Sequence, residues 1–250
     1  MAFNETQFKI GLKLLTKIWN AFKFMHENTK DTGLNLKNKV DYQNLDTCNS
    51  YILSKTSQTF QEYKNLLNQG EFGLALEKLF WHDFCDNHIE LIKDQFLNPD
   101  KHQANNTPQI LLLAGLQILQ MYAPYIPFIT ENIFQQVYKD RLQIDSIHLT
   151  TFSDIQLNYH NENALTSMKQ LQSIVDAVRK LKTNNQLSLK TEIENLIITN
   201  TNQKFIDEHF KVISGITKAK NILVKEATSK IIADDLVKKG ETYDMHINLC

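Results

Sequence analysis

Apolar residues recur at helical spacing along the N-terminal part of the chain. The periodicity predicts helices over about residues 5–28, from 44 or 46 to 68, 72–96, 108–122 and 129–138. Residues 108–122 are apolar nearly all round, so this helix is expected at the centre of the others. Four or five helices joined by short connections predict a helical bundle.

The pattern changes after Ile144. Residues 146–152 look extended. Helices are predicted over about 161–183 and 202–214, and short β-rich runs at 194–199, 222–224 and 242–248. The predicted fold is therefore mainly α, with a helical bundle at 1–156 followed by a small α/β domain at 157–250.

The helix predicted at 5–28 has two distinct faces. One is an ordinary apolar core face: Leu14, Leu15, Ile18, Phe22 and Met25. The other combines cations, an amide and an aromatic ring: Thr6, Lys13, Lys17, Asn20 and Phe24. A solvated helix face rarely carries a Phe, because burying that side chain stabilises the fold by about 1.5–3 kcal/mol.

The position of Phe24 allows two interpretations. In the first, its ring packs against a neighbouring loop, as a small apolar contact away from the main core. In the second, this face of the helix binds a single-stranded RNA loop. Bases would then stack on Phe24, Asn20 would read a base edge, and lysine ammonium groups would hold phosphates.

Charge is distributed unevenly along a chain that is nearly neutral overall. The formal net charge is −1, and 22% of the residues are charged. Residues 1–39 carry seven lysines against three acids, whereas residues 71–100 carry seven acids against two lysines. A locally basic segment can bind a phosphate backbone even when the whole chain is neutral.

Several classes of protein are excluded by composition. The three cysteines are too few and too scattered for a disulfide framework, and they fit a reducing compartment. The N-terminus lacks the form of a signal peptide. The best transmembrane candidate, 110–129, contains two glutamines and is broken by two prolines. We expect a cytoplasmic protein without a membrane partner.

One cluster, from Trp81 to His88, resembles a metal site. A metal would need three or four converging ligands, but the pairs His82/Asp86 and Cys85/His88 lie on different helix faces. A core position for the apolar members is the favoured interpretation. The sequence also contains no glycine-rich phosphate loop and no G-x-S-x-G elbow. We therefore predict no catalytic residue and no metal ligand.

A basic segment at 179–185 ends the helix predicted at 161–183. Cations at a helix C-terminus are favourable because of the helix dipole alone. The same segment would also suit contact with phosphates, and the sequence leaves both interpretations open.

The chain resembles valyl-tRNA synthetases, which are class I aminoacyl-tRNA synthetases, in four stretches. The first is LLTKIWNAFKF (14–24), similar to the family's K-[IL]-W-N-A-x-[RK]-F helix. The second is SYILSK (50–55), similar to the W-I-L-S segment with Tyr51 in place of Trp. The third is LEKLFWHDFCDNHIELIK (76–93), similar to F-x-W-H-D-F-C-D-x-Y-[IL]-E with His88 in place of Tyr. The fourth is YAPYIPFITENIFQ (122–135), similar to H-P-x-x-P-F-[IL]-T-E-E-[IL]-W.

This resemblance implies a bundle of the anticodon-binding type, with the tRNA(Val) anticodon stem-loop as its partner. By position, Phe24 falls where a bundle Phe of the family contacts the anticodon, and Asn20 and Lys23 flank it in the same motif. Lys13 and Lys17 are added from the helical wheel alone. The predicted RNA-binding residues are therefore Asn20, Phe24, Lys23, Lys17 and Lys13.

The family's ATP-binding signatures, of the H-I-G-H and K-M-S-K-S types, are absent. We therefore expect either a fragment of a larger ligase or a free-standing derivative. The chain itself should use no cofactor, and a catalytic domain elsewhere would use ATP and Mg. The alternative function is a protein-interaction module that no longer binds RNA. A metalloprotein built around His82 and Asp86 ranks third.

Overall fold

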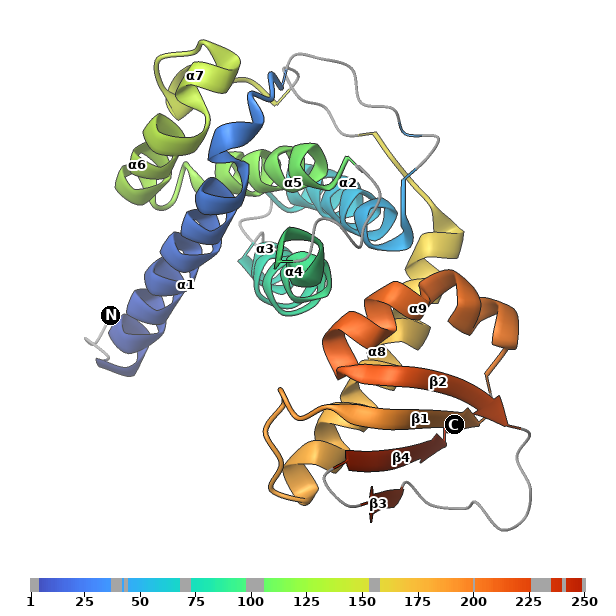
Figure 1. Cartoon of the computed structure of the whole chain (residues 1–250). Helices are drawn as coiled ribbons and strands as arrows, with labels where there is room; N and C mark the ends of the chain where they lie inside the picture. Colours follow the sequence, from blue (N-terminus) through green and yellow to red (C-terminus); the bar gives the residue numbers. More distant parts are fainter. Residues whose placement is uncertain are drawn as a thin grey trace. The chain divides into compact units, whose positions relative to one another are not determined.

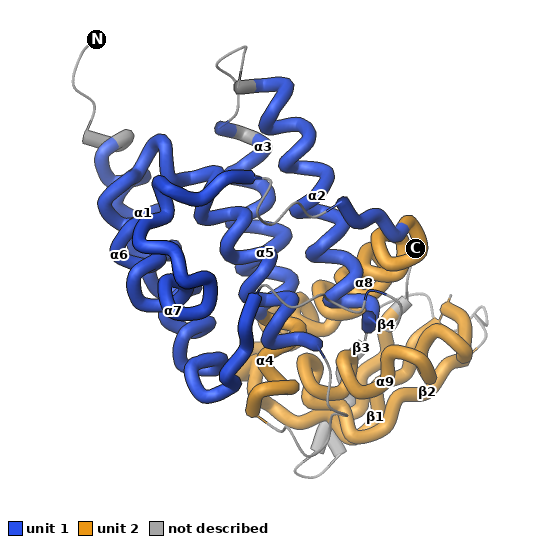
Figure 2. The backbone as a smooth tube through the Cα atoms, turned by 90° about the horizontal axis from the view of Figure 1, so that it is seen from above, with its two compact units in different colours: residues 1–89, 102–161 blue, residues 90–101, 162–250 orange. Residues whose placement is uncertain are grey.

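The chain forms two compact units in the computed structural model (Figures 1 and 2). The first comprises residues 1–89 and 102–161, and the second comprises 90–101 and 162–250. The structure describes residues 5–36, 42, 45–67, 73–97, 106–152, 158–199, 201–225, 235–239 and 242–248. The border predicted between residues 156 and 157 lies outside these described residues.

The first unit is built from helices. Its α-helices are α1 (Glu5–Thr29), α2 (Thr47–Leu67), α3 (Gly73–Lys78), α5 (Thr107–Tyr122), α6 (Pro127–Val137) and α7 (Lys139–Leu142). A π-helix, η2 (Leu79–Ile89), follows α3 directly, and two 3-10 helices are η1 (Lys30–Thr32) and η4 (Ile147–Leu149). Asp46 caps α2, because its carboxylate accepts a hydrogen bond of 2.8 Å from the backbone N–H of Asn49.

These helices confirm the periodic pattern of the sequence, with one correction. Residues 146–152, which looked extended, contain the 3-10 turn η4. The turn forms because the Ser146 hydroxyl accepts a hydrogen bond from the backbone N–H of His148 at 3.2 Å. A local side-chain acceptor of this kind competes with extended backbone.

Helix α5 lies at the centre of the first unit, as its nearly continuous apolar sequence predicts. Every side chain from Ile110 to Tyr122 is buried. Helices α1, α2 and α6 pack around α5, and Figure 1 shows this arrangement. Burial on all sides explains why residues 108–122 show no polar face.

Gly115 is the point of closest approach inside this bundle. A Cβ atom at Gly115 would overlap the end of the Met25 side chain and would lie 2.8 Å from the Tyr138 hydroxyl. That hydroxyl donates a hydrogen bond to the Leu112 carbonyl at 3.0 Å and lies 3.1 Å from Met25 Sδ. The missing side chain of Gly115 therefore makes room for the contact between α1 and α5.

The long helix predicted at 72–96 has π geometry in its middle. In η2 the buried positions fall at 79–80, 83–85 and 88–89. This repeat of four to five residues is the wider spacing of a helix with i→i+5 hydrogen bonds. The predicted extent of the helix is confirmed, whereas its α geometry is corrected over these residues.

His88 is fully buried in η2. Neither ring nitrogen has a hydrogen-bond partner among the described residues, and the ring stacks on Phe84 with centroids 6.2 Å apart. Burial lowers the pKa of His88 to about 3, an effect that the nearby backbone of Cys48 offsets only in part. The imidazole is therefore neutral at pH 7.

The second unit combines helices with one sheet. Its helices are α4 (Glu90–Leu97), α8 (Glu162–Asn184) and α9 (Gln203–Thr217), and its strands are β1 (Ile193–Thr199), β2 (Ala219–Lys225), β3 (Asp235–Lys239) and β4 (Thr242–Asn248). The described strands have the order β2-β1-β4-β3, with β1 parallel to both neighbours and β3 antiparallel to β4.

The sheet confirms the predicted α/β character of this part. In its register Asn195 lies opposite Asp244, and the Asn195 amide donates a hydrogen bond of 2.9 Å to the Asp244 carboxylate. Helix α9 connects the parallel strands β1 and β2. Helices α8 and α9 pack on each other and on the sheet, so they cover the same face. Strand β3 was not predicted, because its sequence has only two apolar residues.

Lys182 fastens α8 to the rest of the second unit. Its ammonium group donates hydrogen bonds to the backbone carbonyls of Leu189, Thr191 and Thr217 at 3.0, 2.7 and 2.9 Å. The residue is only 1% exposed. Burial, together with the charge of Lys218, lowers the pKa of Lys182 to about 8, so the group is still mainly protonated at pH 7.

We predict that Gly115→Ala destabilises the bundle by about 1–3 kcal/mol, because the added methyl group displaces Met25 and Tyr138. The free energy of unfolding, measured by urea titration and circular dichroism, tests this expectation. The matched control is Gly11→Ala on α1, where an added Cβ meets nothing within 4 Å. The control should be neutral or stabilising. Equal stability of the two variants would contradict the packing argument.

We also predict that His88 makes stability depend on pH below neutrality. The pKa is about 3 in the folded chain and about 6.5 in the unfolded chain, so the unfolded chain binds more protons between these values. Stability should therefore fall on acidification, by about 2 kcal/mol from pH 6.5 to pH 5. His88→Phe should remove this part of the slope in urea titrations, whereas replacement of the exposed His148 by Gln should not.

Candidate nucleic-acid interface

Helix α1 carries all five residues that the sequence predicted to bind RNA. Lys13, Asn20 and Lys23 are exposed, whereas Lys17 and Phe24 are half-buried. Four of them, spaced by four, three and four residues, lie along one side of the helix and are called the α1 stripe here: Lys13, Lys17, Asn20 and Phe24. Lys23 lies beside the stripe.

Lys17 is held by two residues of η2. Its ammonium group donates a hydrogen bond of 2.8 Å to the Asp86 carboxylate and lies 4.1 Å from the centroid of the Trp81 ring. The stripe therefore faces η2 at this point. Asp86 already neutralises part of the Lys17 charge. Of the three lysines among the five residues, Lys13 and Lys23 are therefore the more accessible to a ligand.

Phe24 is neither a core residue nor a fully exposed one. On the same helix Phe22 is 2% exposed, and Phe8 is 68% exposed. A half-buried ring keeps one part in contact with protein while another part stays accessible. This position is compatible with both interpretations of Phe24, the loop contact and the stacking of a base.

The structure adds a feature that the helical wheel missed, a hollow of about 250 Å³ between α1 and α6. Trp19, 40% exposed, and the predicted residue Lys23 line it from α1. His26 and, from α6, Gln136 also line it. The sequence feature that could have indicated this hollow is the Trp of the W-N-A-x-K-F stretch, because it belongs to neither of the two faces described for the predicted helix. An aromatic ring, a cation and an amide together form a surface that suits a nucleotide.

Two other residues from the candidate segments, Asp83 and Lys182, have structural roles. Asp83 is buried and accepts a hydrogen bond of 2.5 Å from the Tyr51 hydroxyl. Within the described part of the chain, no group of three His, Cys, Asp or Glu side chains is placed to hold a metal ion. In the basic segment 179–185, Lys182 is buried and bound to carbonyls, so only its neighbours remain open to phosphates.

A family of known proteins matches more than half of the chain. Residues 49–198 match the family described as the anticodon-binding domain of tRNA ligase. The chain belongs to this family. The matched region begins in α2 and ends in β1, so it includes most of the bundle and lies C-terminal to α1.

Relatives of the chain confirm the resemblance to valyl-tRNA synthetases. It is 30% identical to the valine–tRNA ligase of Ehrlichia ruminantium (strain Welgevonden) over 236 residues, which cover 91% of this chain and 28% of the relative. It is 32% identical to the valine–tRNA ligase of Ehrlichia canis (strain Jake) over 205 residues, which cover 78% of this chain and 24% of the relative. The chain thus spans less than a third of each relative's length.

None of the helices in the described ranges is long and apolar enough to cross a bilayer.

Proposed function

We propose that this chain is the anticodon-binding region of a valine–tRNA ligase and that it binds the anticodon stem-loop of tRNA(Val) through α1. Asn20 and Phe24 would contact bases, and Lys13 and Lys23 would contact phosphates. The observation that supports this proposal best is the placement of Asn20, Lys23 and Phe24 at or near the surface of a bundle that belongs to the anticodon-binding family.

Binding and chemistry would be divided between this chain and the catalytic domain of the ligase. Activation of valine by ATP and Mg, followed by transfer to the tRNA, would take place in the catalytic domain. This chain would hold no cofactor and no catalytic residue, and it would act in the cytoplasm. It would contribute affinity and discrimination by holding the end of the tRNA that carries the anticodon.

Lys17 has a different role in this proposal from the one expected from the helical wheel. Because its ammonium group is bound to Asp86 and Trp81, Lys17 would position α1 against η2 and add little direct attraction for phosphates. The neighbouring carboxylate of Asp86 would also repel an approaching phosphate. The Lys17–Asp86 pair would therefore lower the affinity of this face for tRNA.

We predict that Phe24→Ala weakens binding of tRNA(Val) by about 1–3 kcal/mol, because a base loses its stacking partner. Fluorescence anisotropy with labelled tRNA(Val) and a non-cognate tRNA, at low and moderate salt, measures the loss. Phe24→Leu separates the two interpretations, since Leu keeps apolar packing but offers no ring for stacking. Phe128→Ala is the control, because this ring is 90% exposed at the start of α6, outside the stripe.

Loss of affinity in both Phe24 variants, with unchanged circular dichroism and unchanged binding by Phe128→Ala, is the expected result. Full affinity in Phe24→Leu would refute stacking and favour the packing role. If the unmodified chain binds neither tRNA even at low salt, the protein-interaction alternative replaces the proposal.

We predict that Asp86→Asn strengthens tRNA binding, because it removes a repelling charge and releases the ammonium group of Lys17. The plot of log affinity against log salt should become steeper by about one unit. Glu62→Gln is the matched control, since it removes one exposed negative charge from α2 at a distance along the chain from the stripe. Equal slopes for the two variants would show that Lys17 does not reach RNA even when it is released.

A further inference from the structure

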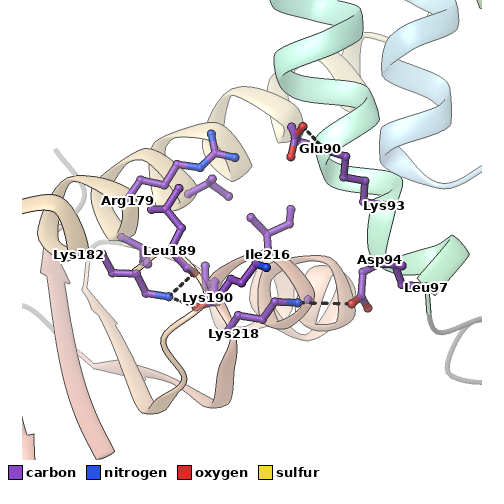
Figure 3. A pocket seen from close by; sticks show the side chains of 14 residues that line it. Glu90, Lys93, Asp94, Leu97, Arg179, Lys182, Leu189, Lys190, Ile216 and Lys218 are labelled. Atoms are coloured by element: carbon purple, nitrogen blue, oxygen red, sulfur yellow. Dashed lines mark hydrogen bonds and ion pairs between the residues drawn. The ribbon is translucent and has the colours of Figure 1, made fainter. Parts of the chain in front are cut away.

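A second hollow, lined entirely by residues of the second unit, has a volume of about 260 Å³ (Figure 3). It lies between α4, α8 and α9, and the segment that leads from α8 to β1 closes it on one side. We call it the α8–α9 hollow. None of the residues proposed above to contact the anticodon lines it.

Cations outnumber acids around this hollow, and the acids are already paired. Five of its lining residues are cationic: Lys93, Arg179, Lys182, Lys190 and Lys218. Only two are acidic, and Glu90 forms an ion pair with Lys93 while Asp94 lies 3.7 Å from Lys218. The acids thus neutralise two of the five cations, and a net positive charge remains.

Arg179 and Lys190 are the cations that remain available to a ligand. Neither side chain forms an ion pair or a hydrogen bond with any residue in the described ranges. Figure 3 shows the Arg179 guanidinium extending from α8 toward the side of the hollow where Glu90 and Lys93 lie. Guanidinium groups bind phosphate oxygens through two parallel hydrogen bonds, so Arg179 is well suited to this ligand.

Lys182 gives the hollow a fixed positive charge. All three of its ammonium protons are donated to backbone carbonyls, so it has none left for a ligand. Its charge is nevertheless buried at the edge of the hollow, where the surroundings screen it less than water would. An anion bound by Arg179 and Lys190 would be stabilised further by this charge.

The other walls are apolar and limit the size of the ligand. Val175, Val178, Leu189 and Ile216 supply apolar surface next to the cations. A volume of about 260 Å³ is slightly below the usual range of small-molecule sites, which is about 300 to 1,000 Å³. A single nucleotide combines a phosphate with a flat, largely apolar base at about this size, whereas an isolated inorganic anion would leave the apolar walls unused.

From this arrangement we infer that the α8–α9 hollow binds one nucleotide, with its phosphate on Arg179 and Lys190 and its base against Leu189 and Ile216. The nucleotide is either one unit of an RNA chain or a free nucleoside monophosphate. The site is separate from the α1 stripe, so it does not depend on anticodon binding there.

Nuclear magnetic resonance of the whole 15N-labelled chain tests the inference, with AMP as the probe. We expect saturable shifts at amides around the hollow, such as Gly215 and Ile216, and no such shifts with adenosine, which lacks the phosphate. Inorganic phosphate should compete with AMP. The double variant Arg179→Gln/Lys190→Gln should bind AMP at least about tenfold more weakly.

The matched control is Lys180→Gln/Lys211→Gln, which loses the same two charges from exposed positions on α8 and α9 outside the hollow. It should bind AMP like the unmodified chain. Absence of saturable shifts with AMP, or an equal loss in both double variants, overturns the inference. Shifts that persist in Phe24→Ala would show that the hollow acts independently of α1.

A second measurement identifies the source of the nucleotide. Anisotropy titrations of labelled tRNA(Val) over a range of salt give the slope of log affinity for each double variant. A slope shallower by about one unit in the hollow variant than in the control assigns the nucleotide to the RNA chain. Equal slopes together with AMP binding assign a free nucleotide.

Discussion

The position of α1 depends on the absence of a side chain at Gly115. With only a hydrogen atom there, the end of Met25 and the hydroxyl of Tyr138 fit against the backbone of α5. Because a protein interior is closely packed, a methyl group at Gly115 would have to displace the ends of the Met25 and Tyr138 side chains. The stripe proposed to bind RNA ends one residue before Met25, at Phe24. The buried contact of Met25 with α5 and the proposed RNA-binding face therefore lie on the same turn of α1.

The sequence predicts most of the helices because buried apolar residues recur along it at the spacing of a helix turn. The central place of α5 follows from its apolar residues on every side, and the strands β1 and β2 follow from short apolar runs. The π geometry of η2 could not be predicted, because apolar clusters four to five residues apart fit an irregular α-helix as well. Residues 90–101 belong to the second unit, although they lie within the sequence of the first. This assignment depends on long-range packing, so no local sequence pattern predicts it.

The candidate sites were predicted unevenly for a related reason. A motif and a helical wheel place Asn20, Lys23 and Phe24 on α1, but neither shows that Lys17 meets Asp86 from a helix 69 residues away. Lys182 looked like part of a basic surface, yet three carbonyls hold it inside the second unit. The side chain of Arg179, three residues earlier, is available to a ligand. The charge of a lysine alone does not reveal whether it stabilises the fold. That role depends on whether the fold brings backbone carbonyls within hydrogen-bond distance of its ammonium group.

The π-helix η2 constrains how this gene can change. It leads without a break into α4, so each residue added or removed within 79–89 would turn the rest of the helix by about 100°. Such a turn would carry Leu91 and Ile92, now buried, toward solvent, or else pull Phe84 out of the core. We therefore expect this segment to tolerate single substitutions better than insertions or deletions.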